Sequence, residues 1–420
     1  MLCGGEGVAV GRGGEVEATA AEAGAGSPPS AAAALSLDAV DVGEMWECPF
    51  IVRLPVVSDS DGGGGACVRA FTLVCVSPYP HCRPHCAGAG TRPTNPPIFW
   101  LCEEGEERDG GRVGRSIDLA AAIVGPLRLD LGDTLYAPTT PAAGGGGPGG
   151  KGAVMMAWLQ ELRGPGAAAA AAAEDASASP RGRARDYAGC LSLARELSVR
   201  VRGDGTPRLH QAPLAALAGL RVGGGDPAAV WSPGTRLQPG GRPLPIPGAV
   251  GDAVDLELVF ERPPEAGGEA AADPCCCTGV WLRPRLAAVG DEPGGGSAPD
   301  RPTAVALLAR WDTTPGRLEV VHVTAVTPAG CPDLATVVRR VGGACEGVGG
   351  GRAALRVLAD RSAVEVFAGT GEALATRVYG CGGGGEDAGD TPPRWSVFSL
   401  GGGPAPVPAA AGWAMRAGWE

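Results

Sequence analysis

The sequence predicts an all-β fold, and three observations carry this prediction. Short runs of apolar and β-branched residues recur along the chain between loops rich in glycine and proline, of which the 420 residues hold 71 and 39. Residues 254–258 alternate apolar and acidic side chains, which is typical of a strand with one packed face and one solvated face. No segment carries the period of a long amphipathic helix.

The first half of the chain divides by composition into three ranges. Residues 1–44 are rich in Gly, Ala and Glu, and we expect this low-complexity range to be disordered. Residues 45–165 contain short strand-like runs at 49–54, 68–76, 98–102 and 154–162. Residues 166–186 are rich in Ala and Gly and are expected to form a linker.

A second β-rich range follows the linker, from residue 187 to residue 420. It contains at least seven strand-like runs, at 197–202, 254–260, 280–286, 304–311, 318–323, 354–359 and 363–367. This strand count and the spacing of the turns suit a β-sandwich domain.

Charge and targeting signals limit the partners. The net charge of −11 disfavours nucleic acid and anionic membrane surfaces, and it is compatible with a neutral sugar. No signal peptide is visible in the first thirty residues, and no apolar run is long enough for a transmembrane helix. The compartment and the oligomeric state stay open.

Several common kinds of site are not supported. Residues 81–86 (His-Cys-Arg-Pro-His-Cys) have metal-ligand side chains, but no second cysteine pair lies at a zinc-site spacing, so a loop insertion is favoured. The glycine-rich stretches lack the ending of a phosphate-binding loop. With four histidines and no Gly-x-Ser-x-Gly segment, a serine hydrolase is also unsupported. Neither a metal nor an organic cofactor is expected.

The most informative segment is 45–49, Met-Trp-Glu-Cys-Pro, which leads into an apolar strand. It places the Glu47 carboxylate between an aromatic ring and a thiol. A general acid must keep its proton until it is needed, and an aromatic neighbour lowers the local polarity and favours the protonated form. A solvated glutamate on a strand is the alternative interpretation.

Together with four later segments, this motif resembles glycoside hydrolase family 32, the β-fructofuranosidases (invertases, inulinases and levanases). The later segments are 129–138, 158–163, 191–197 and 355–367, and the resemblance runs from about residue 43 to 413. It implies an N-terminal five-bladed β-propeller followed by a β-sandwich. A blade takes roughly 40 to 50 residues, so residues 45–165 have room for about half a propeller. The predicted fold is therefore all-β, a partial five-bladed β-propeller followed by a C-terminal β-sandwich.

The resemblance also implies roles for individual residues. Glu47 corresponds to the general acid/base, although Phe50 stands where the family has an aspartate. Asp130 corresponds to a carboxylate that orients the acid and binds fructosyl hydroxyls, with Leu131 replacing the usual aromatic. Trp46 and Tyr136 would line the substrate site. A turn-forming role for Asp130 and a packing role for Tyr136 are the alternatives. Trp158 is either a sugar-stacking platform or a core aromatic, and the core position is favoured.

The function implied is retaining hydrolysis of terminal β-fructofuranosyl bonds in sucrose or a fructan. The family carries two further acidic segments, Asn-Asp-Pro-Asn-Gly with the nucleophile and Arg-Asp-Pro, and neither occurs before Met45. The chain would thus lack the N-terminal nucleophile blades and could be inactive. The alternative is a non-catalytic sucrose- or fructan-binding remnant, or a truncated gene product. The segment 360–365 is expected to be structural, with a turn at Asp360 and Arg361 and a strand that carries Glu365 in a salt-linked strand pair.

Overall fold

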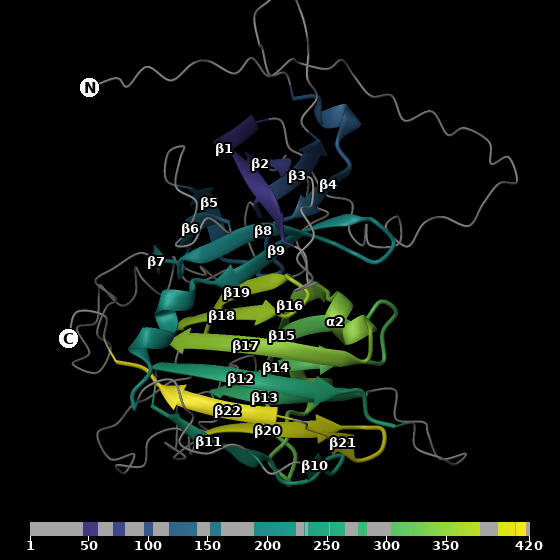
Figure 1. Cartoon of the computed structure of the whole chain (residues 1–420). Helices are drawn as coiled ribbons and strands as arrows, with labels where there is room; N and C mark the ends of the chain where they lie inside the picture. Colours follow the sequence, from purple (N-terminus) through teal and green to yellow (C-terminus); the bar gives the residue numbers. More distant parts are fainter. Residues whose placement is uncertain are drawn as a thin grey trace, which may run out of the picture.

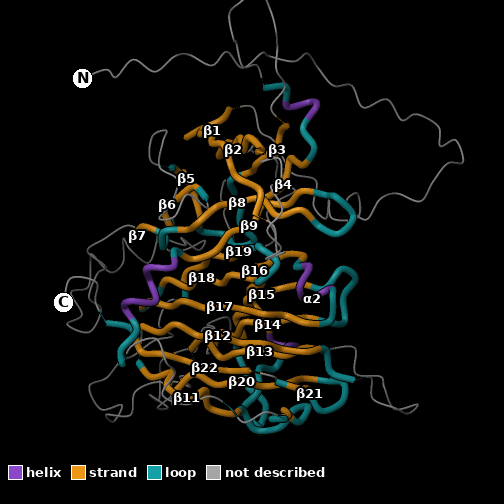
Figure 2. Tube along the Cα trace, viewed as in Figure 1, coloured by secondary structure: helices purple, strands orange, loops and turns teal. Residues whose placement is uncertain are grey.

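The protein is described by a computed structural model over residues 45–57, 70–79, 96–103, 117–140, 152–160, 189–223, 231, 234–251, 253–264, 276–283, 304–378, 394–407 and 409–416. The low-complexity range 1–44, the linker 166–186 and the loop 81–86 lie outside these residues. The all-β prediction is confirmed. Figure 2 shows that strands make up most of the described chain, with only short helical turns. No helix among the described residues is long and apolar enough to cross a membrane.

The first region forms one mixed sheet. Its strands are β1 (Met45–Val57), β2 (Ala70–Tyr79), β3 (Ile98–Glu103), β4 (Val124–Arg128), β5 (Leu135–Thr139), β6 (Ala153–Leu159), β7 (Cys190–Leu191), β8 (Arg195–Val201) and β9 (Pro207–Pro213). Strands β1 to β4 form an antiparallel meander, the form of one propeller blade. Strands β5, β6, β8 and β9 form a second antiparallel group, joined to β1 by a short parallel pairing with β8. This is the partial propeller.

The second region is a β-sandwich of a six-stranded and a five-stranded sheet. The six-stranded sheet has the order β11 (Leu244–Val250), β20 (Arg394–Leu400), β13 (Cys277–Arg283), β14 (Ala304–Arg310), β15 (Arg317–Val323) and β16 (Val337–Ala344). The five-stranded sheet has the order β19 (Ala373–Arg377), β18 (Ala363–Ala368), β17 (Arg352–Asp360), β12 (Ala253–Glu261) and β22 (Ala409–Ala414). A small pair joins β10 (Arg236–Leu237) to β21 (Ala405–Pro406).

Short helical turns connect these strands. They are η3 (Leu119–Ala121), η4 (Ala215–Leu220), η5 (Leu334–Thr336) and α2 (Glu346–Gly349). Strands β7, β8 and β9 pair with strands of the first region. The composition of the chain instead predicts that residues from 187 onward belong to the sandwich. In Figure 1 the first region lies over one end of the sandwich, next to β18 and β19.

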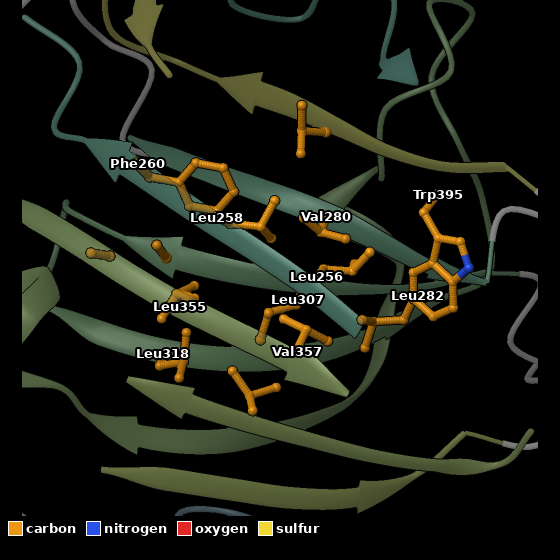
Figure 3. Close-up of a cluster of buried hydrophobic side chains, with 14 of the residues drawn as sticks. Leu256, Leu258, Phe260, Val280, Leu282, Leu307, Leu318, Leu355, Val357 and Trp395 are labelled. Atoms are coloured by element: carbon orange, nitrogen blue, oxygen red, sulfur yellow. The ribbon is translucent and has the colours of Figure 1, made fainter. Parts of the chain in front are cut away.

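The sandwich core fills the space between its two sheets. Alternate residues of β12, namely Leu256, Leu258 and Phe260, point into it and are almost fully buried. Figure 3 shows them beside Leu355 and Val357 of the neighbouring β17 and facing side chains from β13, β14, β15 and β20 of the other sheet. The acidic residues between them, Asp255 and Glu257, lie on the other face, as the alternation in the sequence predicts. Glu257 is exposed there, but Asp255 is fully buried by its arginine partners, so the expected solvated face is wrong at Asp255. Packing of both sheets against this shared core holds the sandwich together.

We expect Leu256→Ala to lower the free energy of unfolding by about 2–5 kcal/mol, because it leaves a cavity in a close-packed interior. Leu244→Ala is a matched control, because Leu244 is 37% exposed, and it should cost about 0.5 kcal/mol or less. Urea unfolding followed by tryptophan fluorescence measures both values. Equal losses in the two variants would contradict the assigned core.

Candidate functional site

Glu47 lies on a distorted part of β1, at the edge of the first meander. The pairing of β1 with β2 places Glu47 opposite Ser77 and then shifts register before Phe50, which is a β-bulge. Within the bulge Cys48 adopts a positive φ of 48°. Bulges re-aim side chains and are common beside functional sites. The half-buried Glu47 side chain is thereby directed across the sheet toward β5 rather than along the meander.

Tyr136 of β5 meets this carboxylate. Its hydroxyl donates a hydrogen bond to Oε2 of Glu47. The other oxygen, Oε1, has no hydrogen-bond partner among the residues that the structure describes. The backbone beside Tyr136 is fixed as well, because Ala137 N donates to the buried Ser77 hydroxyl at 3.3 Å. Glu47 and Tyr136, which are 89 positions apart in the sequence, thus form one polar pair. The hydrogen-bonding capacity of Glu47 Oε1 is not used by any residue that the structure describes.

Two partly exposed tryptophans lie near the pair in the sheet, but only Trp158 contacts it. Trp158 of β6 packs edge-on against Tyr136 at 6.0 Å between ring centroids. Trp46 is 37% exposed, and its ring lies 5.6 Å from the buried Trp100, on the face of the meander opposite Glu47. Trp158 is 39% exposed, so the core position that the sequence favours for it is wrong. Aromatic rings with one open face are suited to holding the apolar face of a sugar ring.

Asp130 lies in a different environment from Glu47. Its side chain is 1% exposed, and its oxygens accept hydrogen bonds from three protein donors. These are Gly132 N at 2.7 Å, Ala375 N at 2.8 Å and Arg195 Nη1 at 2.8 Å. A role in substrate binding stays a prediction for Asp130, and the contacts support a structural role at the junction with the sandwich.

Arg195 is the centre of that junction. This fully buried side chain of β8 donates to Asp130 and, through Nε and Nη2, to Glu365 of β18 at 3.0 and 2.8 Å. It also donates to Gln211 Oε1 at 3.0 Å. Burial by itself would lower the pKa of Arg195, but the two carboxylates raise it. Arg195 lies in the segment 191–197, which carries part of the resemblance to family 32, but the sequence alone predicts no role for it.

The segment 360–365 is structural, as expected, but its ion pair differs from the expected one. Asp360 and Arg361 lie at the turn between β17 and β18, where Arg361 has a φ of 52°. Glu365 does not join the two strands of its hairpin. It accepts from Arg195 and from Leu193 N, so it connects the sandwich to the first region. The sequence cannot reveal this partner, because it lies 170 residues away.

A second polar cluster of the junction surrounds His322 of β15. Arg339 of β16 contacts its ring nitrogen Nε2 at 3.1 Å and also pairs with Asp133 of the first region. Thr376 of β19 donates to the same aspartate at 3.0 Å. Burial, together with the Arg339 guanidinium, lowers the pKa of His322 from 6.5 to about 3. The imidazole is therefore neutral in the folded protein at neutral pH.

The described residues contain no group of three or more His, Cys, Asp or Glu side chains that could hold a metal ion. The histidines and cysteines of 81–86, expected to form a loop insertion, lie outside the described residues.

We expect His322 to make the protein less stable in acid. The unfolded chain takes up a proton near pH 6.5 and the folded chain only near pH 3, so stability is lost as the pH falls between these values. The slope attributable to His322 should approach about 1.4 kcal/mol per pH unit. Urea unfolding between about pH 5 and 7 gives the free energy of unfolding of wild type and of His322→Gln. The difference between their pH slopes is the contribution of His322. Parallel stability curves for the two proteins would contradict the assignment.

Comparison with known proteins gives similarity of fold. No family model and no curated protein sequence matches the chain. Among solved structures, an exo-inulinase from Aspergillus awamori matches with a TM-score of 0.53 and 17% identity, over 89% of this chain and 57% of its own. A fructofuranosidase from Schwanniomyces occidentalis, complexed with fructose, matches with a TM-score of 0.52 and 11% identity, over 89% and 61%. The chain thus spans less than two thirds of these proteins, and what it shares with them is an invertase-like fold of propeller and sandwich.

Proposed function

We propose that the chain is a glycosidase-type domain for terminal β-fructofuranosyl groups, with Glu47 as the general acid/base. One observation carries the proposal. Tyr136 holds one oxygen of the Glu47 carboxyl group, the other oxygen has no described partner, and the partly exposed ring of Trp158 packs against Tyr136. The fold similarity to an exo-inulinase and to a fructofuranosidase complexed with fructose supports the choice of a fructoside.

The proposed chemistry assigns two tasks to Glu47. As an acid it protonates the leaving glycosidic oxygen, and as a base it then takes a proton from the attacking water. Oε1 is the oxygen that carries this proton, because Tyr136 occupies Oε2. Trp46 and Tyr136 are the proposed substrate-binding residues, and Trp46 is partly exposed.

A retaining reaction also needs a second carboxylate, roughly 5 to 5.5 Å from the first. In family 32 this carboxylate belongs to the Asn-Asp-Pro-Asn-Gly segment, which does not occur before Met45 in this sequence. A second candidate function is a sucrose- or fructan-binding module without turnover, which the partly exposed Trp158 ring beside Tyr136 supports. We do not include Asp130 in either site, because its oxygens are taken up by protein donors.

The first test is turnover. If the chain is a hydrolase, purified protein should release fructose from sucrose or inulin, and Glu47→Gln should abolish this release because the amide cannot transfer the proton. A loss of about 10²–10⁴-fold in kcat is typical when a general acid is removed. Glu103→Gln, which changes an exposed glutamate on β3 of the same meander, should keep wild-type turnover. Absence of fructose release by wild type would exclude the hydrolase for this chain.

The second test is binding, and it separates a binding module from a protein without a sugar site. Calorimetry should detect binding of fructose, sucrose or inulin to Glu47→Gln. Trp46→Ala should weaken this binding by about two- to tenfold, because it removes an aromatic contact worth about 0.5–1.5 kcal/mol. Val201→Ala, at an exposed apolar residue of β8, is a matched surface control that should bind as tightly as the parent. No heat with any of the three sugars would remove both functions.

A further inference from the structure

Residues 130–134 bind the sandwich as an added strand, and we name this segment the strap. Leu131 N donates to Ala373 O at 2.8 Å, and Asp133 N donates to Ala375 O at 3.2 Å. In return Ala375 N donates to the Asp130 carboxylate at 2.8 Å. Because β18 pairs with the opposite edge of β19, the strap takes the edge that the five-stranded sheet would otherwise leave open.

The strap fits this edge closely. A Cβ atom on Gly132 would lie 1.7 Å from Ala375 O, so only glycine allows the two backbones to approach in this way. Leu131 packs against the sandwich core and touches Gly343 of β16. The Thr134 hydroxyl adds a hydrogen bond to Ala375 O at 3.1 Å. The sandwich therefore fixes the position of every residue of the strap, by contacts that are apolar, polar and steric.

The strap leads directly into the candidate site. Thr134 is followed by Leu135 and Tyr136 of β5, and Tyr136 donates to Glu47. At the same point Thr134 O accepts from Gln160 N at 2.8 Å, which ties the end of the strap to the end of β6. Thr134 at the edge of the sandwich is therefore connected to Glu47 through only two residues, Leu135 and Tyr136, and the hydrogen bond from Tyr136 to Glu47.

We propose that the strap is the element by which the sandwich positions Tyr136 and, through it, the Glu47 carboxylate. Asp130 is then a positioning residue, held by Arg195 and Ala375 so that the strap stays on the edge of β19. The effect of the strap on catalysis rests on the proposed function, whereas its effect on the position of Tyr136 does not. An experiment can therefore contradict the hydrolase function and still support the positioning role of the strap, or the reverse.

The experiment compares two buried aspartates. Asp130→Asn weakens the ionic anchor of the strap. Asp255→Asn is the matched control: Asp255 is also buried and paired with arginines, at 2.7 Å to Arg221 and 2.8 Å to Arg356, but it lies on β12, away from the strap. Thr134→Val removes one strap hydrogen bond with a side chain of nearly the same shape, and it decides the question if Asp130→Asn does not fold.

The primary readout is the ring Cζ resonance of Tyr136 in protein labelled with ¹³C-tyrosine. The chain has only 4 tyrosines, and Tyr136→Phe assigns the resonance. Asp130→Asn and Thr134→Val should move this resonance, with the smaller shift for Thr134→Val, and Asp255→Asn should leave it in place. If Asp130→Asn and Asp255→Asn lower Tm alike and neither they nor Thr134→Val moves the resonance, the strap is only structural and the proposal is wrong.

Turnover of sucrose is the second readout. In an active wild type, Asp130→Asn should lower kcat by about tenfold to a hundredfold with a smaller change in KM, since a misplaced acid loses rate more than binding. Asp255→Asn should keep kcat within about twofold, the scatter expected for a substitution remote from the site. A wild type without turnover would overturn the hydrolase proposal, while the tyrosine resonance would still decide the role of the strap.

Discussion

The buried guanidinium of Arg195 is the interaction on which the arrangement of the two regions depends. It joins Asp130 of the first region to Glu365 of the sandwich, and it also donates a hydrogen bond to Gln211 Oε1. Taking three charged groups out of water is costly, and it is tolerated only where geometry and further hydrogen bonds are good. Both carboxylates meet that condition, because each also accepts a backbone N–H, from Ala375 and Leu193 respectively. Loss of any one member would leave an uncompensated buried charge.

The same chemistry recurs at the other end of the connecting segment. After β9 the chain crosses the outer face of the five-stranded sheet through η4 and reaches Arg221. This arginine binds Asp255 and stacks on Trp413 at 3.6 Å, much as Arg195 lies 5.3 Å from the Phe367 ring. Leu193 packs in a small apolar cluster on this face. Part of this face is thus covered by Leu193 of the first region and by Arg221, whose backbone pairs with Met415 beside β22.

The sequence predicted the elements whose signal is local and missed those set by distant partners. The runs 318–323 and 363–367 coincide with β15 and β18 to within one residue, because both runs are rich in valine, a β-branched residue that favours strands. Strands β9, β16 and β19 were not predicted, since proline, glycine, arginine or alanine dilute their pattern, and they form because neighbouring strands pair with them. The contact between Glu47 and Tyr136 joins residues far apart in sequence, so only the resemblance could place them in one site.

The segment 130–134 shows how a motif can resemble a site and still serve the fold. The family resemblance gives Asp130 a role in binding fructosyl hydroxyls, and a turn before Gly132 is the alternative. The contacts explain both residues without a ligand: the glycine is required by the approach of Ala375 O, and the aspartate by Ala375 N and Arg195. A carboxylate that is 1% exposed and accepts three protein hydrogen bonds has little capacity left for a sugar hydroxyl. Glu47 is the opposite case, half-buried with one oxygen unpartnered among the described residues, and that difference in unsatisfied hydrogen-bonding capacity is the physical ground for choosing it as the acid.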